Sequence, residues 1–282
     1  MIPRWDTDVY KINNFLDMID KLLDDTDISS LKNRRGQPVK SDIKDYLRLI
    51  LVKEFKDCAL RDAETDWSFF VCRRRVDHSV IHYWEKKIGR EFIEFLVRKL
   101  GKMLEGVLGY DFSFMDSTLF TTWNKKEVEF YTAVRIAKGT LYPVGLFFDQ
   151  SKTPSTAVKG CIVKGNSDLL ADAWYDDNKS FGIMFKYGYN PIVRPNKERF
   201  RGYYRHKARK LYMNPLGMQK YRQRGRGESL YGTLTNQFGD RLTSILNETT
   251  VTRIGCRVLC YMTRIYMRAY TISVNTFFMR IN

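Results

Sequence analysis

The stretch "YDFSFMDSTLF", residues 110–120, decides the fold class. Its aromatic residues Tyr110, Phe112 and Phe114 alternate, which predicts a β-strand with one apolar face. Asp116 continues the alternation and therefore falls on the face that we expect to be buried. A buried carboxylate is costly unless a charged group compensates it. Asp116 is therefore interpreted as an ion-pair partner, a strand-end cap or a member of a functional site.

The sequence after this stretch predicts a mixed α/β domain. Residues 128–148, "VEFYTAVRIAKGTLYPVGLFF", are typical of two strands joined at Lys138-Gly139. A short apolar run at 169–171 precedes Asp172, residues 180–187 favour a helix that ends at Gly188, and "NPIVRPN", 190–196, predicts a further strand. Three consecutive strands followed by alternating helix and strand indicate an α/β fold.

The sequence before it predicts helices. The stretches "KINNFLDMIDKLL" (11–23), "SDIKDYLRLILVKEF" (41–55) and "REFIEFLVRKLGKML" (90–104) place apolar residues at helical spacing. Ser41 is the expected N-cap of the second stretch. We therefore expect two domains, a helical domain at 1–105 and a mixed α/β domain at 106–282 that includes C-terminal helices.

A shorter helix, "VDHSVIHYWEKKIG" at 76–89, is expected to start at Asp77 or Ser79 and to stop at Gly89. It follows the basic triplet 73–75. Short helices beside basic residues are typical of a helix-turn-helix-like unit that reads DNA, although an ordinary helical bundle has the same pattern.

The charge distribution favours a polyanionic partner. The chain of 282 residues has 48 Lys and Arg against 32 Asp and Glu, a net charge of +16. Residues 191–226 hold twelve of the basic residues and one acid, Glu198. A nucleic acid and an anionic membrane are the usual partners of such a surface. Aromatic residues lie between the cations, which favours nucleic acid. The candidate DNA-binding residues are Tyr221, Arg222, Arg224, Arg226, Arg205, Lys207 and Arg209.

Cysteines and apolar segments bear on the expected compartment. The five cysteines form no CxxC pair, and with three scattered histidines they give no zinc-ligand spacing. Their odd number and the lack of a recognisable signal peptide favour reduced thiols in a cytoplasmic protein. Arginines at 257, 264 and 268 interrupt the apolar segment 254–279, so we do not expect it to span a membrane.

Three carboxylates border apolar elements and form a candidate metal site. Asp116 follows one predicted strand, Asp172 another, and Glu228 begins a helix marked by Leu230, Leu234, Phe238, Leu242 and Ile245. Asp176 and Asp177 are interpreted instead as helix N-caps. Carboxylate oxygens are the ligands that Mg²⁺ prefers. Two such ions can activate the attacking oxygen and stabilise the leaving oxygen at a phosphodiester.

These residues resemble a known family, the DDE transposases of prokaryotic insertion sequences that carry a Tyr-x2-Arg-x3-Glu-x6-Lys signature. Tyr221, Arg224 and Glu228 fit its spacing, and Thr235 stands where the signature has lysine. "FSFMDST" is similar to the strand of the first aspartate, "LLADAWYDD" to the second-aspartate motif, and 76–89 to the helical segment before the catalytic domain. The likeness covers roughly residues 35 to 275.

The resemblance implies that 106–282 is an RNase H-like catalytic domain with a five-stranded mixed sheet flanked by helices, preceded by a DNA-binding or dimerisation domain at 1–105. It also implies an enzyme of DNA transposition, with Asp116, Asp172 and Glu228 as catalytic and metal-binding residues. Mg²⁺, with Mn²⁺ as a substitute, would support endonuclease cleavage and strand transfer at the element's ends. The expected partner is double-stranded DNA, both transposon ends and target, bound by a homodimer in the prokaryotic cytoplasm at the nucleoid. Two alternatives stay open, a transposase-derived DNA-binding protein without catalysis and an RNase H-like nuclease that does not join strands.

Overall fold

The computed structural model describes residues 4–31, 42–148, 153–196, 201–239 and 241–279. The chain divides into two compact units, one of residues 1–96 with 244–282 and one of residues 97–243. The sequence predicts that 1–105 and 106–282 are domains that fold independently of each other. That division stays a prediction.

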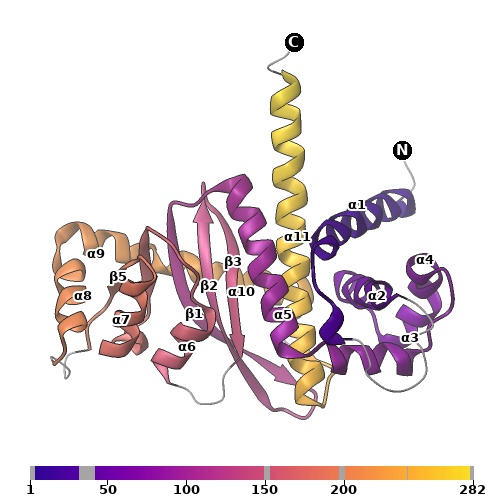
Figure 1. Ribbon diagram of the computed structural model, residues 1–282, viewed down its shortest axis with the longest axis horizontal. Coiled ribbons are helices and arrows are strands. Elements are labelled where there is room, and N and C mark those ends of the chain that lie inside the picture. Colours follow the sequence, from indigo (N-terminus) through magenta and orange to yellow (C-terminus); the bar gives the residue numbers. More distant parts are fainter. Residues whose placement is uncertain (1–3, 32–41, 149–152, 197–200, 240, 280–282) are drawn as a thin grey trace. The chain divides into compact units, whose positions relative to one another are not determined.

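The described secondary structure of the first unit consists of helices joined by short connections (Figure 1). Its elements are α1 (Arg4–Asp24), η1 (Ser29–Leu31), α2 (Ile43–Lys56), α3 (Leu60–Asp62), η2 (Ala63–Trp67), α4 (Ser68–Cys72), the first part of α5 (His78–Leu108) and α11 (Asn247–Met279). Within the described part of the chain, no helix is long and apolar enough to cross a membrane.

Helix starts in this unit follow the expected chemistry with one correction. The N-cap of α2 is Asp42, whose carboxylate accepts a hydrogen bond from the Lys44 amide, and not Ser41, which lies outside the described residues. Asp77 caps α5, as expected, by accepting from the Ser79 amide. Gly89 has φ 68° and ψ 170° inside α5 and so breaks the helix where the sequence predicts a stop.

A buried ion network joins α2, α5 and α11 in this unit. Lys53 lies 3.0 Å from Glu85, Arg253 lies 3.0 Å from Glu85, and Arg257 lies 3.3 Å from Glu54. All five side chains are buried. Arg257, which interrupts the apolar segment in the sequence, is therefore paired within the helical core.

The second unit is built on a mixed sheet. Its strands are β1 (Phe112–Thr122), β2 (Glu127–Ala137), β3 (Thr140–Phe148), β4 (Asp168–Ala171), β5 (Asn190–Val193) and β6 (Arg241–Leu242). The main order is β3-β2-β1-β4-β5, and β6 pairs with β1 outside it. β1, β2 and β3 are antiparallel, whereas β4 is parallel to both β1 and β5. The expected α/β class with a mixed sheet is confirmed.

The strand hairpin turns where the sequence predicts. Lys138 and Gly139 connect β2 to β3 with φ of 49° and 87°. Two consecutive positive φ values are typical of the tight turns that suit twisted antiparallel strands.

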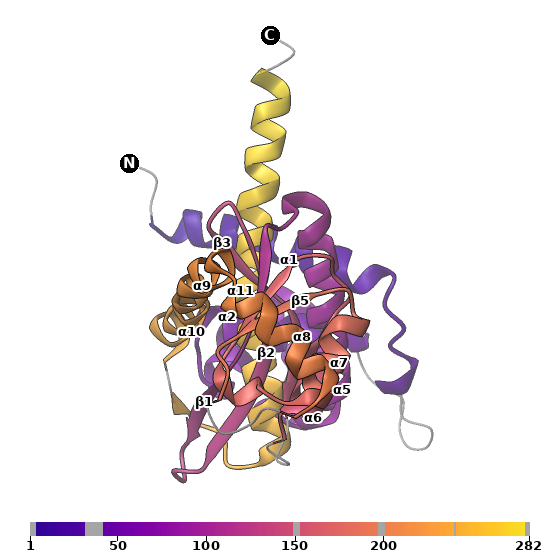
Figure 2. The ribbon, with the colours of Figure 1, turned by 90° about the vertical axis from the view of Figure 1, so that its left-hand side faces the viewer.

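Helices cover both faces of the sheet (Figure 2). They are α6 (Pro154–Cys161), α7 (Asn178–Lys186), α8 (Tyr203–Met213), α9 (Pro215–Tyr221) and α10 (Gly225–Phe238), with the short turns η3 (Ala173–Tyr175) and η4 (Arg222–Arg224). On one face, Gly227 of α10 packs on Phe114 of β1. On the other face, Gly145 of β3 meets the Cys161 carbonyl of α6 so closely that a Cβ would clash.

The helix that carries Glu228, α10, begins at Gly225 and ends earlier than the apolar pattern suggests. Leu230, Leu234 and Phe238 are buried in α10, as expected. The helix ends at Gly239, whose φ of 74° favours glycine, and Leu242 belongs to β6. The predicted continuation to Leu242 and Ile245 is therefore wrong.

Candidate functional site

Strand register places the first two candidate carboxylates side by side. Met115 of β1 is paired with Ala171 of β4, and the two strands are parallel. Asp116 follows Met115 and Asp172 follows Ala171, so the two aspartates continue the same register at the point where β4 ends. Neither side chain is fully buried. Parallel pairing thus brings together two acids that are 56 residues apart in the sequence.

The third carboxylate, Glu228, comes from the helix that covers this face. Gly227 packs on Phe114, two residues before Asp116 on the same face of β1. One helical turn after Glu228, the Tyr231 hydroxyl lies 2.6 Å from Thr132 Oγ1. Thr132 is the cross-strand partner of Asp116. Glu228 is therefore held near the two aspartates by contacts on both sides of it in α10.

Arg224 connects the carboxylates. Its guanidinium lies 3.2 Å from Glu228 and 3.8 Å from Asp172. Burial raises the pKa of Asp116, the Ser117 amide and Arg224 oppose this rise, and the negative charges of Asp172 and Glu228 add to it. The three acids thus lie within electrostatic reach of one another.

Two tyrosines border the same site. Burial raises the pKa of Tyr221, with Arg224 opposing the rise and Asp172 adding to it. Burial also raises the pKa of Tyr231, and Asp116 adds to this rise. Tyr221, Arg224 and Glu228, spaced three and four residues apart in the signature, therefore all lie near the aspartates. The position of Tyr231, three residues after Glu228, predicts that it faces the sheet, but Tyr231 was not among the candidate site residues.

The residues of the site suit a hard divalent cation by their chemistry, since three carboxylates face one arginine. The ligand atoms of Asp116, Asp172 and Glu228 do not form a group within 4.8 Å. Among the described residues, the one group of that size is Glu64, Asp77 and His78. In that group the carboxylate of Glu64 already accepts hydrogen bonds from Arg75 and from both the amide and the ring of His78, so its oxygens have partners within the protein.

The basic segment divides into two groups. Arg222 and Arg226 are exposed in η4 and the first turn of α10, close to Glu228 in the sequence, whereas Arg205, Lys207 and Arg209 lie on α8. Residues 197–200 of the run lie outside the described residues.

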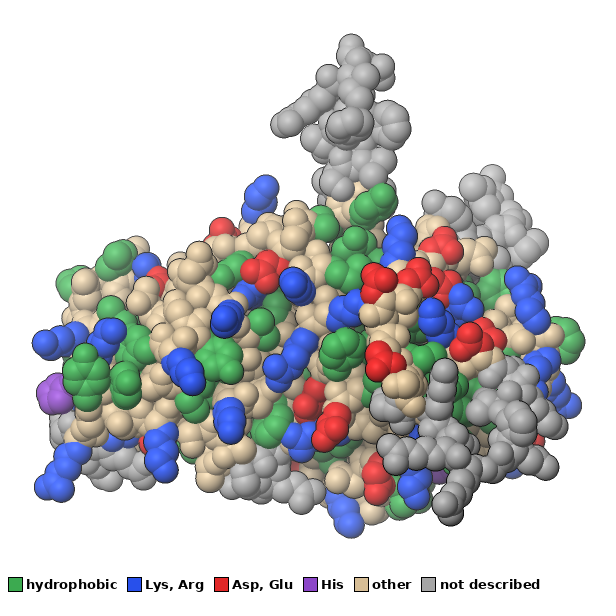
Figure 3. Space-filling view, in the orientation of Figure 1, with side chains coloured by type: hydrophobic (Ala, Val, Ile, Leu, Met, Phe, Trp, Pro, Cys, Tyr) green, Lys and Arg blue, Asp and Glu red, His purple; other side chains and the backbone are tan. Residues whose placement is uncertain are grey.

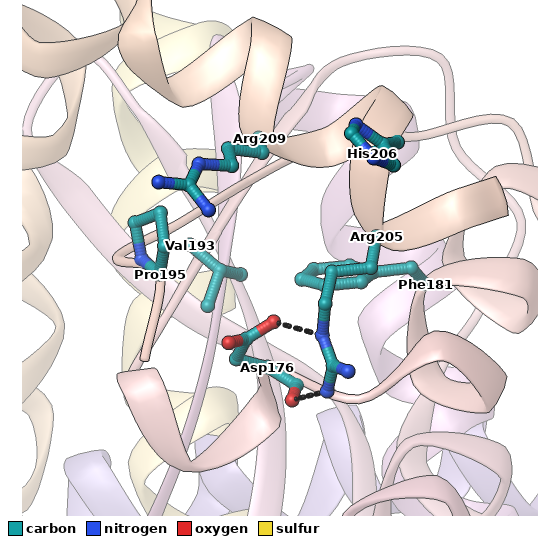
Figure 4. A pocket seen from close by; sticks show the side chains of 7 residues that line it. All are labelled: Asp176, Phe181, Val193, Pro195, Arg205, His206 and Arg209. Atoms are coloured by element: carbon teal, nitrogen blue, oxygen red, sulfur yellow. Dashed lines mark hydrogen bonds and ion pairs between the residues drawn. The ribbon is translucent and has the colours of Figure 1, made fainter. Parts of the chain in front are cut away.

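Arg205 is fixed by an internal partner. Its Nε donates a 2.8 Å hydrogen bond to Asp176, whose side chain is 3% exposed (Figure 4). His206 and Arg209 line the same small pocket. The expected N-cap role of Asp176 is therefore wrong, while Asp177 does cap α7 by accepting from the Ser180 amide. Lys207 lies over the Phe185 ring at 4.2 Å.

Thr235, at the signature's lysine position, bonds within its own helix. Its hydroxyl donates to the carbonyls of Tyr231 and Gly232.

Comparison of the sequence with models of known protein families finds no match, and comparison with curated proteins finds no significant match.

Proposed function

We propose that this chain is a DDE transposase whose second unit is an RNase H-like catalytic domain. The main support for the proposal is that three carboxylates lie near one another: Asp116 of β1, Asp172 at the end of β4 and Glu228 of α10. Sequence-distant carboxylates on one sheet face are the arrangement that metal-dependent phosphodiester chemistry requires. The strand order β3-β2-β1-β4-β5, with β2 antiparallel to its neighbours, supports the RNase H-like assignment.

In this proposal the residues of the site have three roles: metal binding, orientation of a metal ligand and contact with DNA phosphates. Asp116, Asp172 and Glu228 would hold Mg²⁺, which supplies positive charge at the reacting phosphate and activates the attacking oxygen. Arg224 balances part of their charge and orients Glu228 through its ion pair. Arg222 and Arg226, exposed one short turn away, contact the phosphates of the bound DNA strand.

The expected reaction is cleavage and strand transfer at the ends of an insertion sequence, with double-stranded DNA as substrate and a homodimer in the DNA complex. A direct test incubates the full-length protein with a plasmid that carries its reading frame and the flanking DNA, with Mg²⁺ or with EDTA. Nicking at the flanks and joining to a second plasmid are both expected, with Mg²⁺ only.

The same test separates the other two candidates. Nicking without joined products contradicts the transposase and supports a nuclease. Binding without nicking, at any divalent cation tried, supports a non-catalytic DNA-binding protein. The binding measurement therefore has to accompany the nicking measurement on the same preparation.

A further inference from the structure

A second basic surface lies between α6 and α7. The two helices border a groove of about 550 Å³. Residues that supply charges, hydroxyls or a ring to it are Ser155, Thr156, Lys159, Lys179, Lys186 and Tyr204. The groove is away from the carboxylates, because α6 packs on the sheet face of Gly145 whereas α10 packs on the face of Phe114 and Thr132 (Figure 2).

The groove is positively charged without compensation from the described residues. Its three lysines are exposed, and no carboxylate lines it. No described carboxylate forms an ion pair with Lys159, Lys179 or Lys186. In the view of Figure 3, basic side chains predominate over acidic ones on the part of this unit that carries α6, α7 and α8. A surface of this sign attracts polyanions.

The lysines of α7 are spaced for an extended ligand. Lys179, Gly182, Ile183 and Lys186 recur at helical intervals and so share one face of α7. Seven residues of helix separate the two lysines by about 10.5 Å along the axis. One strand of DNA carries a phosphate every 3.4 Å of duplex axis, so this distance corresponds to about three nucleotides.

Tyr204 borders the groove because position 182 is glycine. A Cβ at Gly182 would lie 3.1 Å from the Tyr204 ring. The Tyr204 ring is 39% exposed, and the neighbouring Tyr203 is 74% exposed. Hydroxyls of serine, threonine and tyrosine, together with lysine ammonium groups, are the donors that contact phosphate oxygens without reading bases.

We propose that the groove between α6 and α7 binds the phosphate backbone of a second DNA duplex, independently of its sequence. Charge complementarity, the spacing of the lysines and the hydroxyl donors favour a polymeric phosphate. The proposal rests on the proposed function in one respect, since an enzyme that joins strands must hold two DNA molecules. The sheet separates this groove from the helix that carries Glu228, so the two molecules would have separate sites.

The test removes the three charges together in the full-length protein. Lys159→Gln, Lys179→Gln and Lys186→Gln are combined, and the affinity for a fluorescent duplex of arbitrary sequence is measured at several salt concentrations. Each lost phosphate contact lowers the slope of log affinity against log salt by about 0.9, so three lower it by up to about 2.7. Lys102→Gln, Lys126→Gln and Lys164→Gln form the matched control, because these lysines are also exposed but do not line the groove.

The outcomes decide the proposal without reference to catalysis. An unchanged slope, or an equal fall in slope for the control, overturns it, the latter by showing an effect of net charge alone. A loss confined to single-stranded oligonucleotides, or displacement of the duplex by inorganic phosphate at low concentration, also overturns it. If the slope falls as expected but the wild-type protein never nicks DNA with Mg²⁺, duplex binding by the groove is supported and the transposase proposal is contradicted.

Discussion

Glu228→Gln separates a metal ligand from a structural residue, because the two roles predict effects of very different size. The Glu228 side chain is 61% exposed, and its ion pair with Arg224 spans 3.2 Å. Exposed ion pairs contribute roughly 0.2–1 kcal/mol, so the free energy of unfolding should change by about 1 kcal/mol or less. The amide also keeps the size and the hydrogen-bonding capacity of the side chain.

The expected loss of activity is far larger. A metal ion contributes several kcal/mol of transition-state stabilisation, and every 1.36 kcal/mol corresponds to a factor of ten in rate. Loss of one anionic ligand should therefore slow nicking by at least about 100-fold. DNA binding should persist or tighten, because a negative charge near the phosphates is removed. Nicking of the flank-containing plasmid with Mg²⁺ and urea unfolding are measured on the same protein.

Glu248→Gln is the control, since Glu248 is likewise exposed in the first turn of a helix, α11. Asp116→Asn and Asp172→Asn should reproduce the Glu228→Gln phenotype, whereas Asp177→Asn should not. Nicking by Glu228→Gln within a few-fold of the wild-type rate would refute the three-carboxylate site.

Other residues give further predictions. Combined Arg222→Gln and Arg226→Gln should flatten the salt dependence of duplex affinity by up to about 1.8 in slope, and an unchanged slope would exclude them as phosphate contacts. Arg205→Ala should lower the free energy of unfolding by roughly 3–5 kcal/mol, measured with urea, because it leaves buried Asp176 without its cation. Burial raises the pKa of Cys58 to about 11, so its alkylation at pH 8 should be on the order of 100-fold slower than that of a free thiol and should rise with pH; labelling at the free rate would contradict this.

The strands and the carboxylates were predictable because local patterns and tertiary structure agree there. Alternation of Phe112 and Phe114 marks β1, and the left-handed pair Lys138-Gly139 marks the turn to β3. Asp116 and Asp172 could be identified because each follows directly on an apolar run. The sequence could not show that they lie in adjacent register, since that depends on the parallel pairing of β1 with β4.

The partners of the basic residues were not predictable, because they depend on tertiary contacts between distant segments. Arg205 and Asp176 are 29 residues apart, and nothing in the local sequence distinguishes Arg205 from the exposed Arg222. The same holds for Arg257, which pairs with Glu54 from 203 residues away. A run of cations in sequence thus contains both ion-paired members, such as Arg205, and exposed members, such as Arg222.

Charge balance distinguishes the candidate site, whose acids are partly or largely exposed, from the buried acids of the protein. Asp176 has one cation, Arg205, and in the helical unit Glu54 and Glu85 are matched by Lys53, Arg253 and Arg257. Around Asp116, Asp172 and Glu228, by contrast, Arg224 is the cation whose contacts the structure records.

Three carboxylates and one guanidinium sum to two negative charges when all are ionised, which is the charge that one divalent cation neutralises. Burial is the main cause of the raised pKa of Asp116, and the charges of Asp172 and Glu228 add to it against the opposing effects of the Ser117 amide and Arg224. Asp116, the acid whose pKa is raised by burial, forms no ion pair with a described residue, whereas buried Asp176 is paired with Arg205. The excess of negative charge on the sheet face covered by α10 therefore favours a cation-binding role, and the same argument makes Arg224 the residue whose loss should increase the affinity of the site for Mg²⁺.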